Sequence, residues 1–343
     1  MLDSTRPTAM AHAFMLNIDS ELVKLPDISS YNLYYGWYLG ELVENDNFFD
    51  EFRAKFPDAI IGLSEYGADG NPDLHTPRPE RGDYSEEYQA IYHEHMVKMI
   101  AGRPYLWATH IWNMFDFAAD GRDEGGKHGL NQKGLVSFDR KVKKDAFYVY
   151  AAYWSKHQFV HVCGRRYVDR IEEFTQIKVY SNCPKVTLFI DNSFFEEKIG
   201  SKIFNFNVPI SGCHMIRAEY ENHSDCIKIQ KVDIPNPNYS LPQSCIINWF
   251  DKDDAKEGYF NIKNTLGEIS AVPEGAELIA KLMSAARARR GDVTQGVTRS
   301  AAMQKAINST SLEKILQVGD SLDKEFLVEI VRNVHNIKMT EEE

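Results

Sequence analysis

Residues 59–67, AIIGLSEYG, indicate the fold of this chain. The apolar run at residues 59–63 has the length and composition of a strand covered on both faces, as in a parallel sheet. It leads directly into Ser64-Glu65-Tyr66-Gly67. A carboxylate is thereby placed where a buried strand opens into a loop, which is where barrel enzymes present catalytic groups. We therefore expect Glu65 to belong to a functional site.

The segments around this strand alternate between strand and helix. Four phenylalanines at helical spacing predict one helix, which ends at Pro57. A second predicted helix runs from Ser85 to Gly102. Alternation of this kind indicates βαβ units and a parallel sheet, here about half of a (β/α)8 barrel over residues 1–156. The predicted strands are residues 9–16, 30–38, 59–63 and 105–117.

From residue 157 the pattern changes to short runs in which apolar and polar residues alternate. Turn signals such as Asp191-Asn192 separate these runs. Alternation with period two predicts an antiparallel, immunoglobulin-like β-sandwich over residues 157–235. The expected inward positions are Ile177, Val179, Val186, Leu188, Ile190, Phe204, Phe206, Val208, Ile216, Ala218, Ile227 and Ile229.

Residues 236–343 are predicted to form a linker and a small helical region. Pro273 begins a helix, and Thr310 with Glu313 resembles a capping box before another. A last amphipathic stripe runs from Phe326 to Val334. We see no chemistry in this tail and expect it to pack or to contact a partner.

The composition argues against several classes of protein. The 343 residues carry a formal net charge of −11, so neither nucleic acid nor an anionic membrane is an expected partner. No apolar run approaches the length of a membrane span, and Met1-Leu2-Asp3 shows no secretory signal. The five cysteines form no C-x-x-C pair, as is typical of reduced thiols. We expect a cytoplasmic protein.

Aromatic side chains accompany the candidate carboxylate. Glycoside cleavage needs two carboxyl groups, one that attacks or activates water and one that protonates the leaving oxygen. Tyr34 lies in a run too rich in tyrosine for simple core filling, because buried hydroxyls need partners. Trp112 offers an indole face on which a sugar can stack. The alternatives are core packing for both rings and a simple ion pair for Glu65.

Two further motifs do not predict a metal site. His93-Glu94-His95 lacks the spacing that places two zinc ligands on one helix face, which favours a structural role. The acidic segment from Asp116 to Asp123 fails the calcium-loop template, with Ala118 and Lys127 at ligand positions. We expect no metal and no cofactor.

Together, these segments resemble the retaining glycosidases of glycoside hydrolase family 2, which includes β-galactosidases and β-glucuronidases. The resemblance extends over roughly residues 6–235 and implies that residues 1–156 are the C-terminal half of the barrel. Its motifs are Arg6-Pro7, Asn32-x-Tyr34-Tyr35-Gly36-Trp37-Tyr38, Ser64-Glu65-Tyr66-Gly67-Ala68-Asp69, Ile111-Trp112-Asn113-Met114-Phe115-Asp116-Phe117, Asn131-Gln132-Lys133-Gly134-Leu135 and Asp139-Arg140-Lys141.

The resemblance implies a role for each site residue. Glu65 matches the nucleophile that forms a glycosyl-enzyme ester, and Tyr34 matches a tyrosine that hydrogen-bonds near it. Trp112 matches a platform tryptophan that often precedes a non-proline cis peptide. Asn131 and Lys133 match an Asn-x-Lys motif that grips the sugar carboxylate in glucuronidases, although related galactosidases also show it. Asn32 is assigned to substrate binding with them.

One required group has no match. The family's general acid/base is the Glu of an Asn-Glu pair, and this sequence contains no Asn-Glu dipeptide. The matching region begins just before the fifth barrel strand, so strands one to four and the N-terminal sandwiches have no counterpart. Asp69 and Asp116 are candidates for a neighbouring carboxylate, but neither occupies the family's position.

We predict that the parent enzyme hydrolyses terminal β-D-galactosides with retention and that this chain alone has little activity. One alternative is a β-glucuronidase, and another is a non-catalytic assembly or carbohydrate-binding fragment. The expected partner is a β-galactoside or another β-glycoside. A homo-oligomer and a complementing N-terminal chain also stay open, because a half barrel leaves exposed strand edges.

Overall fold

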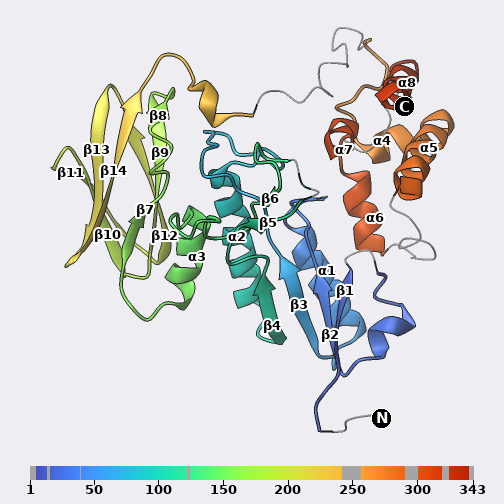
Figure 1. Ribbon diagram of the computed structural model, residues 1–343, viewed down its shortest axis with the longest axis horizontal. Helices are drawn as coiled ribbons and strands as arrows, with labels where there is room; N and C mark the ends of the chain where they lie inside the picture. Colours follow the sequence, from blue (N-terminus) through green and yellow to red (C-terminus); the bar gives the residue numbers. More distant parts are fainter. Residues whose placement is uncertain are drawn as a thin grey trace. The chain divides into compact units, whose positions relative to one another are not determined.

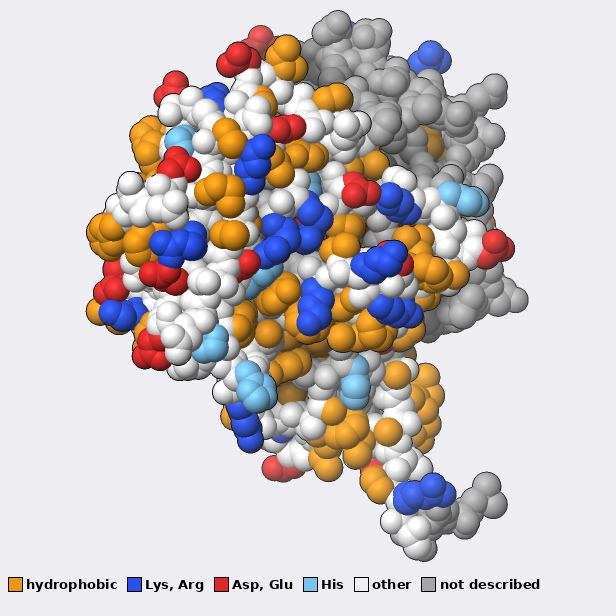
Figure 2. Space-filling view, turned by 60° about the vertical axis from the view of Figure 1, so that its left-hand side comes forward, with side chains coloured by type: hydrophobic (Ala, Val, Ile, Leu, Met, Phe, Trp, Pro, Cys, Tyr) orange, Lys and Arg blue, Asp and Glu red, His pale blue; other side chains and the backbone are white. Residues whose placement is uncertain are grey.

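The computed structural model describes residues 5–13, 16–38, 40–120, 122, 124–241, 256–289, 300–318 and 324–339. The chain divides into two compact units, one of residues 1–60 with 242–343 and one of residues 61–241. Within the described residues, no helix is long and apolar enough to cross a membrane. Figure 2 shows hydrophobic side chains scattered among charged ones on one face, as is usual for protein surfaces.

The unit of residues 61–241 begins with a βαβ arrangement. β3 (Ile61–Tyr66) and β4 (Leu106–Ile111) are parallel neighbours, and α2 (Glu86–Ala101) connects them. The Ser85 hydroxyl caps α2 by accepting a hydrogen bond from the Tyr88 amide at 3.0 Å, and Gly102 ends the helix. The helix predicted over residues 85–102 and the adjacent parallel strands are therefore confirmed.

The chain then forms a small hairpin and a second helix. β5 (Phe117–Ala118) pairs antiparallel with β6 (Leu130–Asn131). α3 (Asp145–Trp154) follows and packs beside α2 (Figure 1). The strand predicted over residues 105–117 is thus two strands, with the segment around Trp112 as a loop between them.

Two facing sheets make up the rest of this unit (Figure 1). One has the strand order β11-β10-β13-β14-β8 and the other β12-β9-β7. They share one core that contains every predicted inward residue except Ile190, which is partly buried and packs against it. The strands are β7 (Val160–Val162), β8 (Asp169–Arg170), β9 (Phe174–Ser181), β10 (Lys185–Ile190), β11 (Ser193–Ile199), β12 (Lys202–Pro209), β13 (Cys213–Tyr220) and β14 (His223–Lys231).

Polar contacts join the helices of this unit to its sheets. Glu94 of α2 accepts hydrogen bonds from the Lys178 ammonium and the Tyr180 hydroxyl of β9, each at 2.5 Å. Glu86 at the start of α2 accepts a hydrogen bond from Arg166 Nε at 2.9 Å. Glu94, the central residue of the His93-Glu94-His95 motif, therefore has the structural role that was predicted. The boundaries predicted at residues 156 and 235 stay predictions.

The other unit contains a short parallel sheet and a group of helices. β1 (Ala9–Ala13) pairs parallel with β2 (Ile28–Asn32), η1 (Glu21–Lys24) lies between them, and α1 (Glu44–Lys55) follows. The tail forms α4 (Leu266–Ser270), α5 (Pro273–Arg289), α6 (Ala301–Asn308), α7 (Leu312–Val318) and α8 (Lys324–Val334). α5 begins at Pro273, as predicted. The apolar faces of these helices share one core, which confirms the predicted stripe on α8.

Some boundaries differ from the sequence-based expectation. β2 ends at Asn32, so Tyr34 lies beyond the strand, and β3 extends through Glu65. The Thr310 hydroxyl donates to the Ala306 carbonyl at 2.9 Å instead of capping α7. The reciprocal capping box lies at Thr265 and Glu268, before α4. After β14, η2 (Pro237–Tyr239) forms where a linker was predicted.

Candidate active site

Glu65 lies near the carboxyl end of β3, as the sequence predicts. Leu63 and Tyr66 are fully buried, whereas the Glu65 side chain is partly exposed. The Tyr66 hydroxyl accepts a hydrogen bond from the Tyr150 hydroxyl at 3.1 Å, which anchors the strand end in the interior. Because side chains alternate along a strand, Tyr66 fixes the strand while its neighbour Glu65 points to the opposite face.

The loop that carries Trp112 is bonded directly to this strand end. The Trp112 amide donates to the Tyr66 carbonyl at 2.8 Å, and the peptide between Trp112 and Asn113 is cis. Gly67 permits the approach, since a Cβ there would lie 2.1 Å from the Trp112 carbonyl oxygen. Any larger residue would have to push the two segments apart.

The Asn-x-Lys motif lies against the same loop. The Asn113 amide donates to the Lys133 carbonyl at 3.0 Å, and the Lys133 amide donates to Asn131 Oδ1 at 3.0 Å. A Cβ on Gly67 would lie 3.8 Å from Lys133 Cδ. The structure therefore brings the residue after Tyr66, the Trp112 loop and the Asn-x-Lys motif together at one end of β3.

Lys133 is held by a buried carboxylate. Its ammonium group pairs with Asp69, and both side chains are about 1% exposed. Asp69 also accepts from Arg122 at 3.2 Å and from the Gln132 amide at 3.0 Å. Arg122 in turn contacts Glu124 at 2.8 Å, so this group of side chains holds two cations and two carboxylates.

Asp116 is also engaged in a buried ion pair. Its Oδ1 lies 2.8 Å from the Lys144 ammonium and accepts from the Gly134 amide at 2.8 Å. Burial raises the pKa of Asp116 and lowers the pKa of Lys144, because removal from water penalises both charged forms. Neither Asp116 nor Asp69 is presented as a free acid beside Glu65.

Comparison with known proteins finds similarity to glycosidases. No family model matches the chain. It is 37% identical to a β-glucuronidase of Bacteroides fragilis over 195 residues, which are 55% of this chain and 28% of that protein. The crystal structure of an FMN-binding β-glucuronidase from Faecalibacterium prausnitzii L2-6 is similar with 43% identity and a TM-score of 0.69, over 70% of this chain and 38% of that one.

This chain is homologous to part of the family 2 glycoside hydrolases. It spans less than two fifths of the length of either relative. A Bacteroides fragilis structure provisionally assigned as a β-galactosidase is also similar, with 28% identity and a TM-score of 0.64 over 68% of this chain and 37% of that one. The family resemblance inferred from the motifs is therefore confirmed.

Two predicted site residues lie in the other compact unit. Asn32 ends β2, and the Tyr34 ring packs 5.2 Å from the Tyr38 ring with 9% of the residue exposed. The fully buried tyrosines of this run are Tyr31 and Tyr35, so part of it fills the core. The contribution of Asn32 and Tyr34 to a family 2 site stays a prediction.

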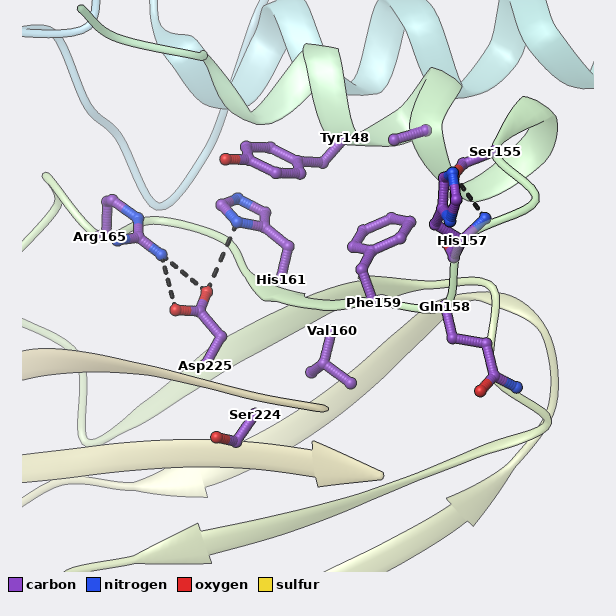
Figure 3. A pocket seen from close by; sticks show the side chains of 11 residues that line it. Tyr148, Ser155, His157, Gln158, Phe159, Val160, His161, Arg165, Ser224 and Asp225 are labelled. Carbon is purple, nitrogen blue, oxygen red and sulfur yellow. Dashed lines mark hydrogen bonds and ion pairs between the residues drawn. The ribbon is translucent and has the colours of Figure 1, made fainter. Parts of the chain in front are cut away.

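The sequence reasoning missed a pocket of about 460 Å³ between α3 and β7 (Figure 3). The Tyr148 ring stacks on His161 with centroids 3.5 Å apart, and Arg165 makes two hydrogen bonds to Asp225 at 2.9 and 2.7 Å. Phe159 also lines the pocket. The available signal was the concentration of rings and cations at residues 157–166, which follows α3.

Proposed function

We propose that this chain is part of a retaining glycoside hydrolase that cleaves terminal β-glucuronides. The observation that carries the proposal is the placement of Glu65 at the end of β3, beside the Trp112 loop and Lys133, in a chain related to β-glucuronidases. The predicted β-galactoside preference has less support, because most of the similar proteins are β-glucuronidases.

In this proposal the Glu65 carboxylate attacks the anomeric carbon of the sugar. The bond from that carbon to the leaving oxygen breaks, a general acid gives the leaving oxygen its proton, and water then hydrolyses the glycosyl ester. Asp69 and Asp116 are committed to Lys133 and Lys144. We therefore assign the acid/base group to a further part of the parent protein or to a complementing chain that completes the barrel.

Lys133 is the group that would separate a glucuronide from a galactoside. A charge-assisted bond to the sugar carboxylate strengthens binding of the acid sugar only. Asp69 holds the ammonium group in place, and Asn131 fixes the backbone of the motif from the other side. The substrate carboxylate would have to share Lys133 with Asp69.

Covalent labelling tests the proposal. The folded 343-residue chain is incubated with an activated 2-fluoro-glucuronosyl donor and with the matching galactosyl donor, and the adduct is located by peptide mass spectrometry. We expect an adduct on Glu65, formed faster with the glucuronosyl donor, and none in Glu65→Gln. Lys133→Gln should abolish the difference between donors. A folded sample without an adduct on Glu65 would overturn the nucleophile assignment and favour a non-catalytic role.

Binding of flavin mononucleotide is a second candidate function. It is favoured by the 43% identity to the FMN-binding relative over 70% of this chain. The pocket of Figure 3 suits such a ligand chemically. It has the volume of a small-molecule site, the rings of the partly exposed Phe159 and the exposed His157 for a planar ligand, and the Arg165 guanidinium for a phosphate.

Flavin titration tests this second candidate. Quenching of FMN fluorescence by the wild-type chain should saturate, and Arg165→Gln should weaken binding about tenfold or more, since charge-assisted bonds contribute about 1.5–3 kcal/mol. Lys185→Gln, which removes a distant exposed cation on β10, serves as the control. Equal quenching by both variants would place the ligand elsewhere.

A further inference from the structure

Three side chains of metal-binding type converge around His161, which lines the pocket of Figure 3. Asp145 is the first residue of α3, His161 is the central residue of β7, and Cys163 follows that strand. All three are buried, and one ligand atom from each lies within 4.8 Å of the others. His161 Nε2 is 2.9 Å from Asp145 Oδ1. Ligands of a tetrahedral zinc ion are about 3–4 Å apart, given metal–ligand distances of about 2.0–2.3 Å.

The outer contacts of His161 are those of an oriented metal ligand. Its second nitrogen, Nδ1, lies 3.5 Å from an Asp225 oxygen, and Arg165 holds that carboxylate from the other side (Figure 3). Tyr148 stacks flat on the ring, with an interplanar angle of 7°. Ligating histidines almost always have a carboxylate, carbonyl or water on the nitrogen that does not bind the metal, because that contact fixes the tautomer and the ring orientation.

We propose that Asp145, His161 and Cys163 bind one zinc ion. Thiolate and imidazole donors select zinc over magnesium or calcium, which prefer oxygen. The fourth ligand would be water, which can enter from the pocket that the buried His161 lines. The ion would connect the start of α3 to β7 and thus tie the helical part of this unit to its sheets. The site departs from our sequence-based expectation that no metal is bound.

Metal content and cobalt spectroscopy test the proposal without reference to activity. The 343-residue chain is purified, loaded with zinc, desalted and analysed by mass spectrometry, which should find about one equivalent per chain. Cobalt in place of zinc should give a thiolate-to-metal charge-transfer band. Both signals should be lost in Cys163→Ala and kept in Cys183→Ala, which removes another buried thiol from the shared core of the two sheets.

Thermal unfolding distinguishes lost binding from a misfolded variant. Zinc should raise the melting temperature of the wild-type chain and of Cys183→Ala, because a ligand that binds only the native state stabilises it. It should leave the melting temperature of folded Cys163→Ala unchanged. A folded wild-type chain that retains no zinc and gives no cobalt–thiolate band would overturn the proposal and identify His161 and Asp145 as a simple buried hydrogen-bonded pair.

Discussion

The two parts of the unit of residues 61–241 are stabilised in different ways. The shared core of the two sheets consists of apolar side chains and one cysteine, whereas the interior between β3 and α3 holds ion pairs and a fully buried histidine. The ion pairs lie beside the candidate site, at Lys133–Asp69 and Lys144–Asp116. The candidate site is therefore held in place by specific polar contacts that do not tolerate the loss of one partner, and the two sheets are held by apolar packing, in which each side chain contributes separately.

Removal of one member of a buried ion pair should have the largest effect. Asp116→Ala leaves the Lys144 ammonium buried without its carboxylate, and should lower the free energy of unfolding by about 3–5 kcal/mol. Urea denaturation measures the loss. The double variant Asp116→Leu/Lys144→Met, which removes both charges, should recover most of it. If Asp116→Ala were as stable as the wild type, the polar interior would not depend on its ion pairs, and the contrast with the apolar core of the sheets would not hold.

Acid should destabilise the polar interior next. Burial lowers the pKa of His93 to about 3, so the unfolded chain takes up a proton near pH 6.5 while the folded chain does not. The free energy of unfolding therefore falls as the pH drops below about 6.5, by about 2 kcal/mol at about pH 5. Urea denaturation at about pH 6.5 and at about pH 5 should show a smaller loss of unfolding free energy in His93→Phe than in wild type. The exposed-histidine control His157→Gln should behave like wild type.

A methyl group at the β3–Trp112 junction should have a smaller effect. In Gly67→Ala the new Cβ meets the Trp112 carbonyl, and such overpacking costs about 1–3 kcal/mol. Gly102→Ala is a matched control, because its Cβ would meet only atoms at ordinary contact distance, 3.6 Å away. Melting temperatures measure both, and the labelling of Glu65 should fall only in Gly67→Ala. Equal behaviour of the two variants would contradict the close approach.

Trimming the apolar core should have the smallest effect. Ile177→Val removes one methylene from a fully buried residue of β9 and should cost about 0.5–1.5 kcal/mol. The rate at which Glu65 is labelled should be unchanged. If labelling slowed in a folded sample, the sheets would have to contribute to the site more directly than the contacts of α2 and α3 indicate.

The same contrast explains what the sequence could predict. Inward residues such as Phe204 and Phe206 follow from period-two alternation, since apolar burial is additive along a strand. The buried positions of Lys133, Lys144 and His93 could not be predicted that way, because their burial depends on partners far away in the sequence. Lys133 meets Asp69 across 64 positions, and Lys144 meets Asp116 across 28.

The residues of the candidate site could be predicted from the sequence only where they belong to a short motif. Glu65 after an apolar run and Trp112 in a second motif could be singled out, and the structure joins their segments through the Tyr66 carbonyl. The pocket between α3 and β7 was missed because its residues come from α3, β7, the loops beside them and β14, and no single motif connects these segments. Asp145 and Cys163 were missed for the same reason.

The contacts of Glu94 with β9 have a consequence for how this unit comes apart. Because Glu94 is hydrogen-bonded to both Lys178 and Tyr180, local unfolding of α2 should be coupled to local unfolding of β9. Amide protons of β9 and of α2 should then exchange with solvent in a single cooperative opening. A truncation at residue 156 would leave Glu94 without these partners, and we therefore expect it to destabilise α2.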